Sequence, residues 1–93
     1  MMMDNVFRPI AQMTFLSVEH ERLRFKDYCQ ALNGAGVQVD LQDVLHCDSA
    51  GIALLIEIKR ICRALGCVST ICNMPTSASA LAEFYGIREL LND

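Results

Sequence analysis

Residues 37–66 read VQVDLQDVLHCDSAGIALLIEIKRICRALG, and this stretch decides the fold. Apolar and polar residues alternate over residues 37–43, which is the pattern of a half-buried strand, so we expect a central strand there. A short loop follows over residues 46–48. Residues 50–65 have high helix propensity, and Gly66 is a typical residue at a helix C-terminus. The stretch therefore predicts a strand, a tight loop and a long helix.

Signals outside this stretch complete an α/β pattern. Pro9 interrupts the apolar N-terminal segment, which favours two short strands, and Gly34 stops the helix that follows. The predicted order is ββαβαβα, and the elements cover residues 6–10, 13–18, 21–32, 37–43, 50–65, 67–72 and 75–85. Strands that alternate with helices pair in parallel, and the helices pack on the sheet. We therefore expect one α/β domain over residues 1–93, with flexible residues 1–5 and a small mixed sheet whose parallel central strands are covered by about three helices.

The composition argues against several classes of function. The formal net charge is -3, and no run of Lys and Arg is interleaved with aromatic residues, so we expect no nucleic-acid partner. The longest apolar stretch, residues 51–56, is far shorter than the roughly 18 residues that cross a bilayer, and the N-terminus does not read as a signal peptide. We therefore expect a cytoplasmic protein without direct membrane insertion.

The cysteines raise the question of a metal or redox site. The chain has 5 cysteines and no secretion signal, so reduced thiols are expected. Cys62, Cys67 and Cys72 are evenly spaced and, with His46 and Cys47, are the candidates for zinc binding or redox chemistry. No Cys-x-x-Cys pair is present, and a strand would send Cys67 and Cys72 to opposite faces. We therefore interpret the cysteines as small buried hydrophobic residues and expect no metal and no cofactor.

Residues 46–49 also contain the residue types of a nucleophile, a base and an orienting acid. Adjacent residues on a tight turn rarely reach hydrogen-bonding geometry with one another, so we expect no catalytic site there. The glycines are not followed by a lysine in a phosphate-binding pattern, and a nucleotide site is therefore not expected.

The helix predicted over residues 50–65 has two apolar faces. At about 100° per residue, one arc is expected to pack on the sheet, and it contains Leu54, Leu55, Ile58, Ile61, Cys62 and Leu65. The opposite side aligns an apolar patch with a basic end, and it contains Ser49, Ile52, Ala53, Ile56, Arg60 and Arg63. Two outward isoleucines favour a protein-binding surface. The alternative is a small rotation of the helix, which would bury Ile52 or Ile56.

Ser49, at the start of this helix, has two interpretations. As a helix N-cap, its oxygen accepts a hydrogen bond from an early backbone N–H, which contributes about 1 kcal/mol and no function. As an interaction residue, it presents its hydroxyl, or a phosphate, where free N–H groups and the helix dipole favour anions. The sequence alone favours the cap.

The strand, loop and helix start over residues 39–55 resemble the signature of STAS domains, a family named for sulfate transporters and anti-sigma factor antagonists. Residues 73–91 resemble the last strand-to-helix stretch of that family. Within it, the Ala-Gly-Ile-Ala-Leu-Leu sequence that follows Asp48 and Ser49 is most similar to the MlaB-type cytoplasmic subunit of the Mla phospholipid ABC transporter. Many members have a Gly-Glu-Leu-Asp-like turn where this chain has residues 17–20, so we assign no partner contact to the N-terminal third.

This resemblance implies a non-catalytic accessory subunit without cofactors. The implied partner is the ATPase subunit of an ABC transporter that also contains a membrane permease, and the implied role is to support assembly and activity in outer-membrane lipid asymmetry maintenance. The protein is then cytoplasmic and peripheral at the inner membrane through its partner. The residues expected to bind the partner are Asp48, Ser49, Gly51, Ile52, Ala53, Ile56 and Arg60, with the Ser49 hydroxyl facing the ATPase.

A second branch of the family implies a different function. In anti-sigma factor antagonists, the serine that matches Ser49 is phosphorylated by a partner kinase, and the phosphate prevents binding. A phosphate beside Asp48 would oppose association by charge repulsion and by the cost of desolvation. Such antagonists are usually longer than this chain, which favours the transporter interpretation.

Overall fold

The computed structural model describes residues 5–32 and 34–91. The elements follow in the order ββαββαβαα, and they are β1 (Asn5–Phe7), β2 (Gln12–Met13), α1 (Val18–Gln30), β3 (Val37–Asp40), β4 (His46–Cys47), α2 (Ser49–Ala64), β5 (Ser69–Cys72), α3 (Thr76–Phe84) and α4 (Arg88–Leu91). The predicted α/β class with parallel central strands is confirmed. The expected flexibility of residues 1–5 falls outside the described residues, apart from Asn5, which begins β1.

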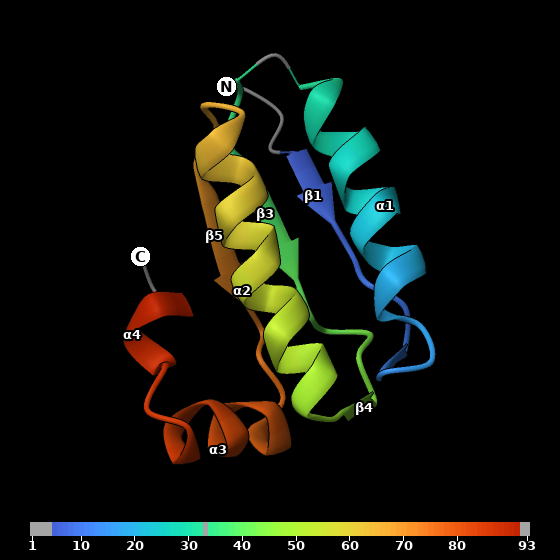
Figure 1. Ribbon diagram of the computed structural model, residues 1–93, viewed down its shortest axis with the longest axis vertical. Coiled ribbons are helices and arrows are strands. Elements are labelled where there is room, and N and C mark those ends of the chain that lie inside the picture. The colour runs from blue at the N-terminus through green and yellow to red at the C-terminus, as the bar shows by residue number, and fades with distance from the viewer. Residues whose placement is uncertain (1–4, 33, 92–93) are drawn as a thin grey trace.

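A three-stranded parallel sheet forms one layer of the molecule. β3 lies at its centre, with β1 on one side and β5 on the other. The helices α1 and α2 lie side by side across one face of this sheet, and α3 and α4 lie near the end where the chain leaves β5 (Figure 1). The start of α2 therefore lies at the same end of the molecule as α3.

A second, two-stranded parallel sheet lies beside the start of α2. β2 pairs with β4, with Gln12 opposite His46 and Met13 opposite Cys47. The loop predicted over residues 46–48 is therefore wrong for its first two residues. His46 and Cys47 form a strand because a segment more than 30 positions earlier in the chain pairs with them. Such long-range pairing is not visible in the local sequence.

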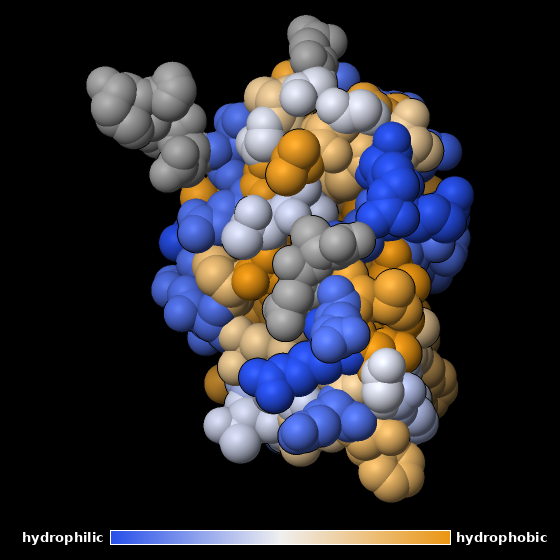
Figure 2. Space-filling model, turned by 90° about the vertical axis from the view of Figure 1, so that its left-hand side faces the viewer, coloured by the Kyte–Doolittle hydropathy of each residue, from blue (hydrophilic) through white to orange (hydrophobic). Residues whose placement is uncertain are grey.

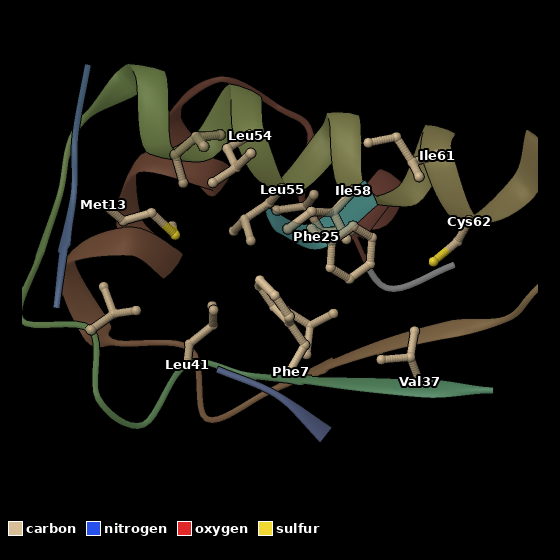
Figure 3. Packing of buried hydrophobic residues seen from close by; sticks show 14 of the residues in the cluster. Phe7, Met13, Phe25, Val37, Leu41, Leu54, Leu55, Ile58, Ile61 and Cys62 are labelled. Carbon is tan, nitrogen blue, oxygen red and sulfur yellow. The ribbon is translucent and has the colours of Figure 1, made fainter. Parts of the chain in front are cut away.

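The hydrophobic core lies between the three-stranded sheet and the two long helices. Leu55 and Ile58 of α2 point toward Phe7 and Leu41, and Phe25 of α1 lies between them (Figure 3). The rings of Phe7 and Phe25 meet edge to face, with their centroids 4.9 Å apart. Burial of each large apolar side chain contributes about 1.5–3 kcal/mol. This packing holds α2 in place on the sheet.

The strand predicted over residues 13–18 is wrong beyond Met13. The backbone N–H of Ser17 donates to the carbonyl of Thr14 at 2.9 Å, and the Ser17 hydroxyl accepts from the Thr14 N–H at 3.2 Å. Local side-chain hydrogen bonds of this kind compete with a strand ladder, so the chain turns and α1 begins at Val18. The turn leaves the side chains of Phe15 and Leu16 on the surface.

Two predictions about the faces of α2 are also wrong. Ile52, predicted to face outward, is only 2% exposed, whereas Leu65, predicted to be core, is 38% exposed. α2 packs against α1, α3, α4, β4 and β5, so it buries a wider arc than a helix on a single sheet face. Leu65 is the C-cap residue, and the chain turns away directly after it at Gly66, where φ is 76°. The other core predictions on this helix are confirmed for Leu54, Leu55, Ile58, Ile61 and Cys62.

The C-terminal end of α3 matches its prediction. Gly86 has a φ of 69°, and the N–H of Ile87 donates to the carbonyl of Ala82 at 3.0 Å, which closes the helix. The Ile87 side chain packs against the hydrophobic core. α4, which packs against α2 and α3, was not predicted. Its four residues are too few for a hydrophobic period to be recognised in the sequence.

Candidate functional site

Asp48 is the N-cap of α2, the role that the sequence had favoured for Ser49. Its backbone is extended, and its Oδ1 accepts a hydrogen bond from the N–H of Gly51 at 3.0 Å. Its Oδ2 accepts a second one from the N–H of Phe15 at 3.1 Å. The cap prediction for Ser49 is wrong because the helix starts one residue earlier than expected and the aspartate already fills the position. The same carboxylate ties the turn before α1 to the start of α2.

Ser49, the first residue of α2, is exposed and meets α3 with its side chain. Its Oγ lies 2.7 Å from the phenolic oxygen of Tyr85, the C-cap residue of α3. Either hydroxyl is able to donate in this pair. The Ser49 hydroxyl therefore does not cap its own helix. It lies at the surface beside the ring of Tyr85.

Gly51 has a packing role. It is buried, and a Cβ built on it would lie 2.2 Å from the carbonyl oxygen of Met13 and 2.8 Å from the sulfur of Cys47. A side chain at this position would push α2 away from the β2–β4 pair, because backbone atoms of β2 cannot yield like the end of a flexible side chain. The absence of a side chain thus allows the close approach that sets the position of the helix start.

The outward face of α2 is narrower than predicted. Ala53 is exposed and Ile56 is 36% exposed, while Ile52 lies in the core. Arg60 is exposed and bonds Glu57, with its Nε 2.9 Å from the Glu57 Oε1. This hydrogen bond from the guanidinium holds the pKa of Glu57 below its ordinary value. The positive charge of Arg60, at the basic end of the predicted patch, is therefore partly neutralised by Glu57 of the same helix.

Two apolar pairs flank the start of α2, and the partner-binding residues predicted from the sequence include neither pair. Phe15 and Leu16 are 71% and 83% exposed, and Phe84 is 82% exposed next to the half-exposed Tyr85. Phe15 is anchored through Asp48, and the rings of Phe84 and Tyr85 meet with centroids 5.4 Å apart. We refer to the combined surface as the docking surface, and it consists of Phe15, Leu16, Ser49, Ala53, Ile56, Phe84 and Tyr85.

A signal for these flanking residues exists in the sequence. Phe15 and Leu16 directly precede Ser17, which closes a turn before α1, and Phe84 and Tyr85 precede the helix-ending Gly86. Both pairs therefore stand at the ends of elements, where side chains reach the surface. Elsewhere, apolar surface also reaches solvent among charged residues on the side that carries β5, α3 and α4 (Figure 2). Exposure alone is therefore not specific, and the position around the start of α2 is what distinguishes the docking surface.

A shallow groove continues the docking surface between α1 and α2. Its floor is apolar and its rim is charged, and it is lined by Val18, Glu19, Arg22, Ala50, Ala53, Leu54 and Glu57. Glu19 and Arg22 form an ion pair along one rim, with 2.7 Å between the Arg22 Nη2 and the Glu19 Oε2. Exposed pairs of this kind add little stability, but they give the groove a polar edge around an apolar centre.

The geometry around residues 46–49 does not resemble a nucleophilic centre. Burial, and then the adjacent Asp48 carboxylate, raise the pKa of the Cys47 thiol to about 11, so the thiol stays protonated at neutral pH. Both carboxylate oxygens of Asp48 accept backbone N–H groups. Among the described residues, the side chains able to hold a metal together are those of Cys29, Cys62 and Cys67, toward the other end of α2.

Comparison with known proteins gives one family. The family model described as "Mlab, STAS domain" matches residues 20–92. No curated protein sequence matches the chain. Within the described residues, no helix is long and apolar enough to span a membrane.

Proposed function

Because the chain belongs to the MlaB-type STAS domain family, we propose that it is a non-catalytic accessory subunit that binds the ATPase of a phospholipid-transporting ABC complex. In that role it supports the assembly and activity of a complex, including a membrane permease, that maintains outer-membrane lipid asymmetry. It is then cytoplasmic and lies at the inner membrane only through its partner.

The observation that carries this proposal is the docking surface. Its aromatic and aliphatic side chains project from three elements that meet at the start of α2, with charged residues along the adjoining groove. Apolar and aromatic centres with polar rims are typical of protein interfaces, and aromatic residues dominate their energetics. The hydrogen bonds of Asp48 and Ser49 fix the surface before binding, which lowers the entropy lost on association.

The expected partner-binding residues divide into two groups under this proposal. Ser49, Ala53, Ile56 and Arg60 are exposed and would touch the ATPase directly. Asp48, Gly51 and Ile52 would act indirectly, because the first caps the helix and the other two are buried. The sequence proposal is thus kept for the helix but extended to Phe15, Leu16, Phe84 and Tyr85.

Copurification tests the partner. The tagged chain is expressed with its genomic neighbours and purified gently from membranes, and stoichiometric partners are identified by mass spectrometry. We expect an ABC ATPase and a permease to copurify with the wild type and with Val68→Ser. Val68 is 70% exposed but lies directly before β5, outside the docking surface. Phe84→Ser should lose both partners.

The outcomes of this experiment test the transporter role and the docking surface separately. Failure of the wild type to bring down an ATPase would refute the transporter role. Retention of the ATPase by Phe84→Ser at the level of Val68→Ser would leave that role standing and refute the docking surface. A strain without the chain should accumulate phospholipid in the outer leaflet of its outer membrane, and normal lipid asymmetry there would contradict the proposed role.

The second candidate function is an anti-sigma factor antagonist switched by phosphorylation of Ser49. The exposure of Ser49 at the start of α2 favours it, because a kinase would reach the hydroxyl without unfolding the helix. A phosphate there would replace the contact with Tyr85 and place nearly two negative charges beside Asp48. A copurified kinase or sigma regulator together with phosphorylated Ser49, in place of an ATPase, would select this function.

A further inference from the structure

Three buried thiols from three different segments meet toward the C-terminal end of α2. Cys29 is in the last turns of α1, Cys62 is in those of α2, and Cys67 lies two residues before the start of β5. The sulfur of Cys29 lies 3.5 Å from that of Cys62 and 3.8 Å from that of Cys67, and all three lie within 4.8 Å of one another. The candidate metal-binding residues in the sequence include Cys62 and Cys67 but not Cys29.

The spacing of these sulfur atoms is that of ligands to one ion. With metal–sulfur bonds of about 2.3 Å, sulfur atoms bound to a common centre lie roughly 3.5–4 Å apart. Two of the three separations already fall in this range. The third separation, between the sulfur atoms of Cys62 and Cys67, is at most 4.8 Å.

An opening at the surface leads toward this cluster. A shallow depression is lined by Cys29, Gln30, Gly34 and Leu65, where the ends of α1 and α2 approach each other. Cys67 is 7% exposed, whereas Cys29 and Cys62 are almost completely buried. The depression therefore reaches the cluster at Cys29.

The surroundings disfavour negative charge on the sulfur atoms. Cys29 and Cys62 are almost completely buried, so a thiolate at either position would lose its hydration. Both cysteines stand near helix C-termini, whose dipoles oppose anions. The nearby charged residue Lys59 donates to the Ser69 carbonyl at 2.7 Å. Three thiolates around a monovalent or divalent ion would leave two or one net negative charges in this core, which is costly.

A trivalent centre avoids that cost. We propose that Cys29, Cys62 and Cys67 form a binding site for trivalent thiophilic semi-metals, with arsenite as the representative ligand. Three S–H bonds and three As–O bonds break, three As–S bonds form, and each hydroxide leaves with a thiol proton as water. No atom is oxidised or reduced, and the product is a neutral complex that the apolar core accepts. Soft ligands such as thiolates favour soft centres of this kind.

The test uses the full chain kept reduced with a thiol-free phosphine. In the double variant Cys47→Ala/Cys72→Ala, only the three cluster thiols remain. We expect arsenite to bind it at one arsenic per chain with the loss of three hydrogens by native mass spectrometry, and to raise its melting temperature. Adding Cys67→Ala to this background should abolish both effects. Circular dichroism and the melting temperature without arsenite verify that each variant is folded.

Each alternative outcome overturns the proposal. Arsenite that leaves the mass and melting temperature of the double variant unchanged would show that the cluster is only hydrophobic packing. Equal binding with and without Cys67 would place the arsenic elsewhere. Binding of Cu(I), supplied as the probe in a parallel titration, without any binding of arsenite would refute the charge argument. If the Cys67→Ala protein does not fold, Cys29→Ala in the same background replaces it.

Discussion

The hydroxyl groups of Ser49 and Tyr85 lie 2.7 Å apart, although 36 positions separate the two residues in the chain. The contact joins the first residue of α2 to the C-cap residue of α3, so it links two of the elements that carry the docking surface. Both side chains are exposed, and water competes for each hydroxyl. The contact therefore matters more for the orientation of the docking surface than for stability.

Tyr85→Phe and Ser49→Ala should each lower the free energy of unfolding by only about 0.5 kcal/mol, the lower end for a hydrogen bond. The double variant should lose no more than the larger single variant, because the two changes remove the same contact. Urea denaturation of the three proteins measures this coupling. Fully additive losses would show that the two hydroxyls do not interact in solution.

Ile56→Glu should remove partner binding and leave the isolated domain folded, because Ile56 is a partly exposed residue of the docking surface. Ile52→Glu is the matched comparison one turn away, and it should unfold the domain, because a charge would be buried without a partner. Circular dichroism and copurification with the ATPase measure the two effects. An unfolded Ile56→Glu protein would mean that this side chain belongs to the core.

Gly51→Ala should destabilise the domain by about 3 kcal/mol or more, since the new methyl group meets the Met13 carbonyl. Gly36→Ala is the control. Its φ is not positive, and a Cβ there lies 3.6 Å from the Val68 carbonyl oxygen, so we expect a change within about 1 kcal/mol in either direction. Thermal unfolding measures the melting temperatures of the Gly51→Ala and Gly36→Ala proteins. Similar melting temperatures would contradict the close approach of α2 to β2.

Asp48→Ala should cost about 1–2 kcal/mol, because it removes the cap of α2 and the acceptor for the Phe15 N–H. Asp48→Asn should recover part of this loss, since an amide oxygen also caps helices. Asp43→Ala, at an exposed position, should change stability by about 0.5 kcal/mol at most. The urea concentration at the midpoint of unfolding measures the stability of all three variants. A loss for Asp48→Ala no larger than that for Asp43→Ala would contradict the capping role.

Glu21 should make the domain sensitive to acid. Burial alone would raise its pKa, but hydrogen bonds from Arg24 and from the N–H of Ile10 outweigh burial and lower it. The unfolded chain then takes up this proton more readily than the folded one. The stabilisation is therefore present above the unfolded-state pKa and is lost as the pH falls through the lowered folded-state pKa.

Glu21→Gln tests this pH dependence. At neutral pH the variant should be less stable by about 1–3 kcal/mol, because Arg24 and the Ile10 N–H lose a charged acceptor. In acid the two proteins should converge. Urea unfolding over a pH series provides the measurement, and parallel curves at all pH values would exclude a contribution from Glu21 ionisation.

The long helix shows what the sequence predicts well. The apolar spacing of Leu55 and Ile58 places both in the core, and the glycine after the C-cap ends the helix as expected. The error at Ile52 has a definite cause. Periodicity describes one covered face, whereas α2 is also covered by α3, α4 and β4, whose positions depend on contacts far along the chain.

The candidate site shows the limit of the same reasoning. The sequence predicts the start of α2 to within one residue, but it favours Ser49 as the cap, whereas Asp48 fills that position. Phe15 was read as part of a strand, and the Ser17 turn that exposes it depends on local side-chain hydrogen bonds. Cys29 joins the thiol cluster only through the packing of α1 on α2, which no spacing along the chain reveals.

The start of α2 is held by features that point inward. Asp48 binds the chain's own backbone, and Gly51 fits against the carbonyl of Met13, while the side chains at 53 and 56 do not take part in either contact. Substitutions at the outward positions 53 and 56 can therefore change the partner without disturbing the contacts that hold the helix start. After gene duplication, descendant copies can exchange their outward residues and acquire new partners, while positions 48 and 51 should change slowly in every lineage.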